Sequence, residues 1–177
     1  CQIIRFEHLH QTHLCELIAK TDEIENPDRA ETLAGLEEVG LAESILWAEE
    51  SFWEFRCELL GLLANVPPAV DQLTHIVQNF VEQEKAPIER RKRMTLTFRL
   101  AAYFYRTLLR LAVNPEAALA HGDAPYLDET LMRSVTKAEK CFDLHHIQAI
   151  DALTRMIDRS LAAEQQTHQN AISSTVI

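Results

Sequence analysis

The chain has 177 residues, of which 47% are hydrophobic and 25% are charged, so it is a globular protein rather than a disordered one. Its net charge of −10, from 17 Lys and Arg against 27 Asp and Glu, disfavours a domain whose main role is to grip DNA phosphates. None of the four cysteines pair at the spacing of a zinc knuckle, and no apolar run is long enough to span a bilayer. These features predict a cytoplasmic protein with no metal, no cofactor and no membrane contact.

The first six residues, CQIIRF, have the apolar and β-branched character of a β-strand. No other segment of the chain has a strand pattern, and a single strand cannot satisfy its own backbone hydrogen-bonding groups. We therefore expect this strand to belong to a sheet formed with residues upstream of Cys1.

The rest of the chain shows apolar residues at spacings of three and four, which is the helical period. Asn26 and Pro27 form a helix start, with Asn as N-cap and Pro at the first helical position. Gly40 is expected to end that helix at about residue 38, and Asn114 with Pro115 repeats the start signal. Helices are predicted over residues 11–20, 27–38, 41–65 and 144–161. Further helices are predicted to begin at Pro68, Pro87 and Pro115 and at about Thr130. A polar break is expected at 166–170, with a last helix after it.

The fold class predicted from this pattern is all-α, with a small helical module over 1–48 and a helical bundle over 49–177. Several helices have wide apolar stripes, so each should pack against more than one neighbour. The core of the bundle is predicted to contain Phe98, Tyr105, Leu109, Leu153 and Ile157.

Candidate metal ligands are few. Residues 7–10 contain one Glu-x-x-His, but a di-iron bundle needs two such pairs and two further carboxylates. The histidines at 8, 10 and 13 are better explained as solvated side chains, and His145 and His146 are adjacent and so point to different sides of a helix. The chain also lacks a phosphate loop, a nucleophile elbow and a zinc-protease motif, so we predict no catalytic residue in it.

Two other features suggest a surface that binds a partner protein. The stretch from Leu46 to Leu60 has more apolar side chains than one helix face requires, and surplus exposed apolar area marks partner sites. The run of four basic residues at 90–93, followed by Arg99, is either a polar helix start or a contact for acidic groups. Glu50, Glu54 and Glu58 form an acidic stripe at helical spacing, for which a solvated face is the simpler interpretation.

The order of these features resembles the clamp-loader subunits of the AAA+ class, and in particular the delta-prime subunit of bacterial DNA polymerase III. In that family a strand like CQIIRF closes the nucleotide-binding domain and leads into a three-helix lid, whose length residues 11–48 match. The segment FYRTLLR at 104–110 resembles the end of a long helix in the family's collar, and the helix from Leu144 also follows the collar pattern.

This resemblance implies a subunit that helps to load the sliding clamp in DNA replication and is not itself an enzyme. Its partners would be the gamma/tau and delta subunits, with the sliding clamp and primer-template DNA reached only through the whole complex. Glu43 stands where an ATP-using lid usually has a cation that reaches the phosphates, so nucleotide sensing is not expected. The residues expected at the partner interface are Phe52, Trp53, Phe55, Arg91, Arg106 and Arg110.

Three alternatives remain open from the sequence. A gamma/tau-type ATPase subunit is disfavoured by Glu43, and a helical-bundle metalloenzyme by the absence of a second Glu-x-x-His. A free-standing helical adaptor is disfavoured by the unpaired strand at the start of the chain.

Overall fold

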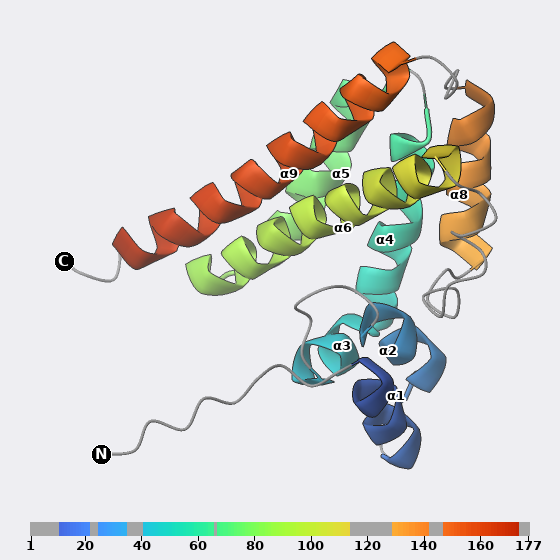
Figure 1. Ribbon diagram of the computed structural model, residues 1–177. Helices are drawn as coiled ribbons and strands as arrows, with labels where there is room; N and C mark the ends of the chain where they lie inside the picture. Colours follow the sequence, from blue (N-terminus) through green and yellow to red (C-terminus); the bar gives the residue numbers. More distant parts are fainter. Residues whose placement is uncertain are drawn as a thin grey trace, which may run out of the picture. The chain divides into compact units, whose positions relative to one another are not determined.

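The computed structural model describes residues 11–21, 25–34, 41–65, 67–113, 129–141 and 147–173, and these form an all-α fold, as predicted (Figure 1). The expected strand at residues 1–6 and the helix start at Asn114 lie outside the described residues. The chain divides into two compact units, one of residues 1–54 with 122–128 and one of residues 55–121 with 129–177. The assignment of 1–48 to a lid and of 49–177 to a collar stays a prediction.

The first unit is built on three short helices that bury small and branched side chains. In the first helix Leu14 and Ile18 are buried, one turn apart on the same face. The second helix buries Leu33 completely, together with two alanines that let its neighbours approach closely. The helices are α1 (Gln11–Lys20), α2 (Pro27–Ala34) and α3 (Leu41–Trp47), with α2 packed against both α1 and α3.

The start of α2 confirms the Asn–Pro signal. Helix α2 begins at Pro27, and the backbone N–H of Ala30 donates to the carbonyl of Asn26 at 3.1 Å. Asn26 is thus the N-cap residue, and Pro27 occupies the position where its missing N–H costs no helical hydrogen bond.

The prediction of one long helix from Leu41 is wrong, because the structure has two helices in this segment. Helix α3 ends at Trp47 and α4 (Glu50–Leu63) begins three residues later. The backbone N–H groups of Ala48 and Glu49 donate to carbonyls only three residues back, which tightens the chain into a turn. The turn places the ring centroid of Trp47 5.9 Å from that of Phe52, and Ala48 in the turn is buried, at 3% exposure.

Arg29 ties α2 to the first turn of α4. Its guanidinium donates to both carboxylate oxygens of Glu50, at 2.6 and 3.4 Å, and lies 5.2 Å from the ring centroid of Trp53. The hydrogen bond from Arg29 lowers the pKa of the Glu50 carboxyl below its ordinary value. Arg29 therefore makes a forked ion pair and a cation–π contact at once, which fixes its long side chain.

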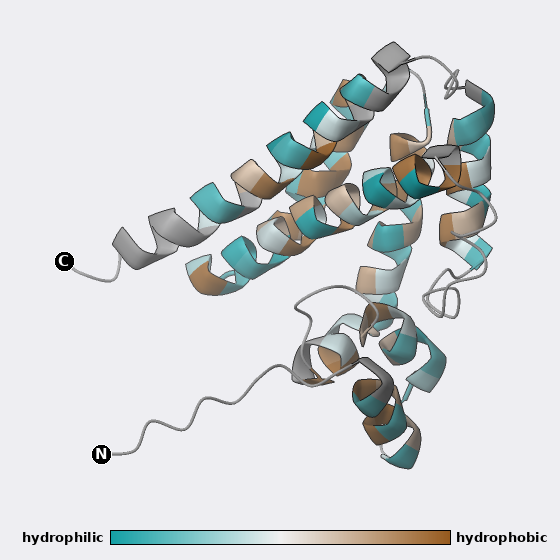
Figure 2. Ribbon diagram, viewed as in Figure 1, coloured by the Kyte–Doolittle hydropathy of each residue, from teal (hydrophilic) through white to brown (hydrophobic). Residues whose placement is uncertain are grey.

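The second unit is organised around α6, which packs against α5, α8 and α9. Leucine or phenylalanine recurs at every fourth position along α6, and these side chains are almost completely buried: Leu96, Leu100, Phe104 and Leu108. In Figure 1, α6 and α9 lie side by side and run in opposite directions, and Figure 2 shows hydrophobic and hydrophilic residues alternating along both. The helices are α5 (Val70–Glu82), α6 (Pro87–Val113), α8 (Glu129–Cys141) and α9 (Ile147–Ser173).

The structure confirms part of the predicted core. Tyr105 and Ile157 are buried, at 6% and 8% exposure. Phe98 and Leu109 are only half-buried, because the side of α6 that carries them is not fully covered. The side chain of Leu153 lies outside the described residues.

Two helix boundaries differ from the sequence pattern. Helix α5 begins at Val70 rather than at Pro68. Helix α9 runs without interruption from Ile147 to Ser173, so the predicted polar break at 166–170 is wrong. That segment has no Gly or Pro, and polar residues such as Gln166 continue a helix on its solvent side. None of the described helices combines the length and the apolar character that crossing a bilayer requires.

Candidate partner interface on helix α6

Positive charge is concentrated in α6. This helix holds seven Lys or Arg and a single acidic residue, Glu89, in a chain whose net charge is −10. Across the whole sequence, the first unit has 3 Lys or Arg against 15 Asp or Glu, and the second unit has 14 against 12. Helix α6 is therefore the cationic element of an acidic protein.

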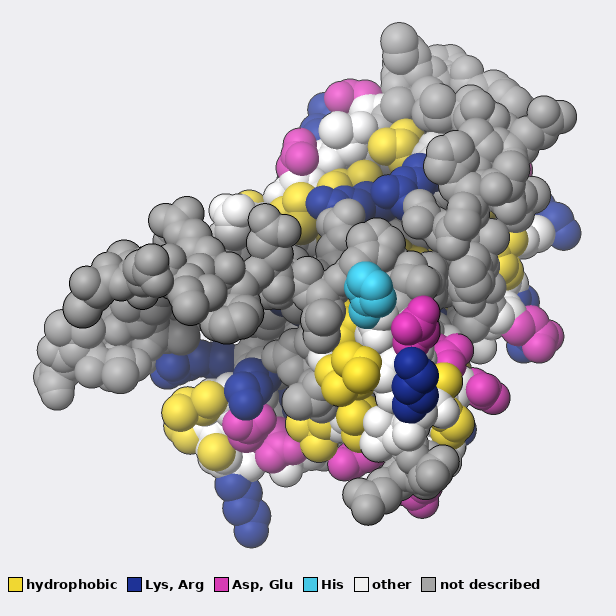
Figure 3. Space-filling view, turned by 60° about the horizontal axis from the view of Figure 1, so that its bottom comes forward, with side chains coloured by type: hydrophobic (Ala, Val, Ile, Leu, Met, Phe, Trp, Pro, Cys, Tyr) yellow, Lys and Arg dark blue, Asp and Glu magenta, His cyan; other side chains and the backbone are white. Residues whose placement is uncertain are grey.

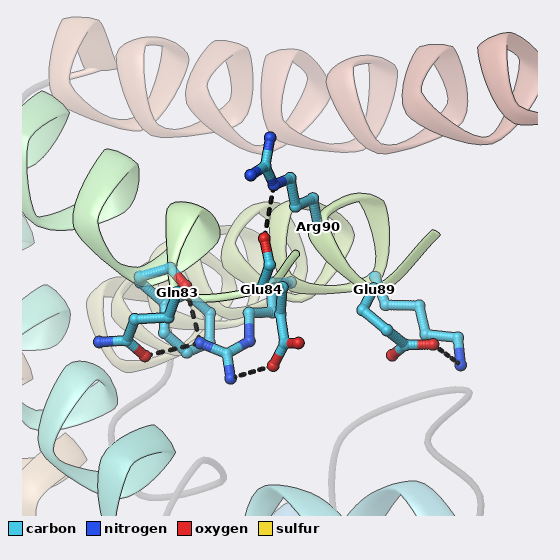
Figure 4. A network of polar contacts seen from close by, with 7 residues as sticks. Gln83, Glu84, Glu89 and Arg90 are labelled. Atoms are coloured by element: carbon cyan, nitrogen blue, oxygen red, sulfur yellow. Dashed lines mark hydrogen bonds and ion pairs between the residues drawn. The ribbon is translucent and has the colours of Figure 1, made fainter. Parts of the chain in front are cut away.

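Two of these cations shape the turn between α5 and α6 (Figure 4). Arg93 donates from Nη1 to the carbonyl oxygen of Phe80 and to Oε1 of Gln83, both at 2.7 Å, and from Nη2 to Oε1 of Glu84 at 2.5 Å. Arg90 donates from Nε to the carbonyl oxygen of Glu84 at 2.6 Å. These bonds reach one carbonyl group in the last turn of α5 and one in the connection that follows it, where backbone carbonyls commonly need partners outside the helix.

The guanidinium of Arg93 also lies over a stack of two aromatic rings. It lies 4.6 Å from the ring centroid of Phe80, which is itself stacked on Phe55 with centroids 3.8 Å apart and planes 6° from parallel. Phe55, Phe80 and Arg93 come from α4, α5 and α6, so three helices meet in one contact. These contacts fix the N-terminal part of α6 against α4 and α5 within the second unit.

Replacing Arg93 by Ala should lower the free energy of unfolding by about 1.5–3 kcal/mol, the cost of losing hydrogen bonds to a charged group that is 21% exposed. Arg93→Lys should lose nearly as much, because one ammonium nitrogen cannot occupy the two positions from which Nη1 and Nη2 reach their acceptors, and it has no planar group to lie over the Phe80 ring. Urea unfolding followed by circular dichroism measures both. Lys92→Ala is the control, since Lys92 is exposed and pairs with the neighbouring Glu89 of the same helix, at 3.0 Å. Equal stabilities for the Arg93 and Lys92 variants would contradict this account of the turn.

One sector of α6 beyond this turn is incompletely covered. Its partly or fully exposed residues alternate with buried ones, since Thr95, Ala102 and Tyr105 on the same side of the helix are 7%, 2% and 6% exposed. In Figure 3, Lys and Arg side chains (dark blue) lie next to hydrophobic ones (yellow) on the face turned forward. We define the α6 sector as the partly or fully exposed residues of this side, which are Arg91, Met94, Phe98, Arg99, Ala101, Tyr103, Arg106, Leu109 and Arg110.

The sector contains three of the six residues predicted for a partner interface. Arg91 and Arg106 are half-buried in it and Arg110 is exposed. The basic run at 90–93 does not act as a unit, because Arg90 and Arg93 turn to the α5–α6 connection and Lys92 pairs with Glu89. Tyr103 was not predicted to lie at an interface, and Phe98 was predicted to lie in the core. The helical spacing of Arg99, Tyr103, Arg106 and Arg110 is the signal that would have grouped them.

The aromatic residues of the predicted interface, Phe52, Trp53 and Phe55, lie in α4 and not in the α6 sector. Phe52 and Phe55 are buried within the chain, at 4% and 6% exposure, so the expectation that they form surplus apolar surface is wrong. The same holds for Leu59 and Leu60, at 2% and 1%. Trp53 is half-buried beside Arg29. Among the large apolar side chains described between residues 46 and 60, Leu46 is clearly exposed, at 53%.

The described residues offer little material for catalysis or metal binding. No group of three or more His, Cys, Asp or Glu among them is placed to hold a metal ion. His13 is exposed, while Glu7, His8, His10, His145 and His146 lie outside the described residues. Burial raises the pKa of the Tyr105 phenol, which therefore stays neutral at physiological pH. The side chains of the α6 sector are suited to binding another molecule, through their guanidinium groups and apolar contacts.

Comparison of the chain with protein-family models, with curated proteins and with solved structures gave no significant match.

Proposed function

We propose that this chain is part of a clamp-loader subunit of the delta-prime type, which works without catalysis by packing its second unit against other subunits. The observation that carries the proposal is the order of sequence features, from CQIIRF through the segment FYRTLLR at 104–110. An all-α chain with two compact units agrees with a lid followed by a collar. The continuous α9 differs from the collar pattern, so the support comes from the earlier parts of the chain.

The α6 sector supports the same proposal physically. FYRTLLR supplies Arg106 and Arg110 to this sector while Phe104 and Leu108 are buried beneath it. A helix that leaves Arg110 exposed and Arg106 and Phe98 partly exposed has, at these positions, the arginine and aromatic residues that are enriched in protein interfaces.

In this proposal the chain binds gamma/tau and delta subunits in the cytoplasm, and it meets the sliding clamp and primer-template DNA only within the whole complex. Cys15 and Cys57 are not joined in a disulfide, which agrees with a reducing compartment. Glu43, in α3, is the residue at the position where a nucleotide-sensing lid has a cation. A carboxylate there repels phosphate, so the subunit is expected to act as a scaffold rather than an ATPase.

The test is co-purification of this chain with tagged gamma/tau and delta subunits from the same organism, at moderate salt. Specific co-elution is expected with at least one of them. Failure to bind either subunit, while circular dichroism shows a folded helical protein, would contradict the proposal. Calorimetric titration with Mg-ATP separates the gamma/tau alternative, because that subunit type would bind with micromolar affinity and the scaffold would not.

A further inference from the structure

The connection between α5 and α6 is an open surface. Lys85, Ala86, Pro87 and Ile88 follow one another there, and all four side chains are exposed, Ile88 at 64%. The structure describes every residue from 81 to 94, and none of them is buried. We call residues 85–92 the turn surface. It therefore holds a short apolar group in contact with water, with basic residues before and after it in the chain.

The backbone under the turn surface is held in place by contacts within the chain. Arg93 donates to the carbonyl oxygen of Phe80 and to the carboxylate of Glu84, and Arg90 donates from Nε to the carbonyl oxygen of Glu84 (Figure 4). A segment that is already ordered loses less conformational entropy when it binds a partner. Ile88, in the first turn of α6, is thus presented from a fixed base.

The turn surface and the residues beside it carry excess positive charge. From residue 82 to residue 93 there are five Lys or Arg and three Glu, in a chain whose net charge is −10. Two ion pairs join Arg93 to Glu84 and Lys92 to Glu89. The charges of Lys85 and Arg91 are not offset by these pairs, so the local potential is positive and attracts carboxylates.

The exposed isoleucine decides between the possible acidic partners. A phosphate backbone satisfies cations, but it leaves Ile88 in water, and the negative charge of the whole chain repels DNA. An apolar pocket in a protein, with carboxylates at its edge, satisfies the isoleucine and the cations together. A buried apolar centre inside a polar rim is also the usual arrangement of protein interfaces.

We propose that the turn surface binds a partner subunit at an apolar pocket with an acidic rim, and this rests on the proposed function. Ile88 enters the pocket, and Lys85 and Arg91 meet carboxylates at its rim. Arg91 is three residues after Ile88 in the same helix, so the two side chains are neighbours on one side of it.

The first experiment tests the apolar contact with a matched pair of variants. The cognate subunit that co-purifies with this chain is the probe, and its Kd is measured by biolayer interferometry. Ile88→Ser should weaken binding on the order of tenfold, because it removes the group that fills the pocket. The control is Val70→Ser, since Val70 is equally exposed, at 65%, but lies at the start of α5, away from the turn. The control should stay within about threefold of the original chain.

The second experiment tests the cations. Lys85→Glu with Arg91→Glu should weaken binding on the order of tenfold at low salt, and by less at high salt, where charges are screened. The control is Arg133→Glu with Lys140→Glu, the same change of charge at two exposed positions of α8. Circular dichroism confirms that each variant is folded before its affinity is compared.

The proposal requires weaker binding by both turn variants. If either one binds as tightly as its control, the inference fails while the proposed function stands, since the subunit still binds. If the original chain binds no subunit, the proposed function itself fails. Fluorescence anisotropy with a DNA oligonucleotide tests a nucleic acid in the same place. DNA binding that is lost in the Lys85, Arg91 variant, with subunit binding undiminished, would overturn the proposal.

Discussion

Replacing Phe104 by Ala is expected to lower the free energy of unfolding by about 3–5 kcal/mol. Phe104 is completely buried in α6, and its ring lies edge-on to Tyr105 with centroids 5.2 Å apart. It follows Leu100 and precedes Leu108 in the buried row of α6, the helix against which α5, α8 and α9 pack. Truncation at this point leaves a cavity that the surrounding helices cannot fill without moving.

The matched control is Phe98→Ala, the same substitution in the same helix at a half-buried position. It should cost about 1–2 kcal/mol, because part of the ring is already in contact with water. Chemical denaturation with a shared slope measures the difference between the two variants. Equal losses of stability would mean that Phe98 is covered as completely as Phe104, and the α6 sector would then not be an open surface.

Replacing Ala162 by Pro is expected to cost about 3 kcal/mol. Ala162 is exposed in α9, fifteen residues after its start at Ile147 and eleven before its end at Ser173. Proline at this position removes the N–H that bonds to the preceding turn, and its ring collides with the carbonyl oxygen four residues earlier. The cost falls on a helix that packs along α6, so it should appear in the unfolding of the second unit.

Ala162→Gln is the control, because it keeps the same exposed position and a good helix former, and it should change stability by less than about 0.5 kcal/mol. Differential scanning calorimetry of both variants gives the comparison. A proline variant as stable as the glutamine variant would show that the helix ends near Leu161, as the sequence pattern alone suggested.

The helical period predicts most of the elements here because each buries one face. Leu14 with Ile18 is visible as a spacing of four in the sequence. In α6 two apolar stripes have helical spacing, and the prediction took the one with Phe98, Tyr105 and Leu109, whereas the most completely buried row is Leu96, Leu100, Phe104 and Leu108. The Asn26–Pro27 start follows from backbone chemistry alone. The turn after Trp47 has no such local signal, since Ala48 and Glu49 are both good helix formers, and it depends on packing between Trp47 and Phe52.

The candidate site is less predictable than the fold. Neighbouring residues of a helix point about 100° apart, so a run such as 90–93 spreads around α6, and the sequence alone cannot assign each cation to a side. Arg93 contacts the α5–α6 turn because the folded chain places the end of α5 beside it, and the local sequence of α6 does not reveal this contact. Phe52 and Phe55 belong to a stripe wide enough to serve either a core or a partner, and packing within the chain buries both.

Site-specific photo-crosslinking tests the central claim most directly, since it asks whether the α6 sector meets a partner subunit. A photoreactive phenylalanine analogue replaces Arg110 in one variant and Arg133 of α8 in the other, both exposed positions of the second unit. Each variant is mixed with the gamma/tau and delta subunits, irradiated, and analysed by mass spectrometry. The account predicts a crosslink from position 110 to one of these subunits, and none from position 133. Crosslinks from position 133 alone, or none from a chain that co-purifies with the subunits, would contradict it.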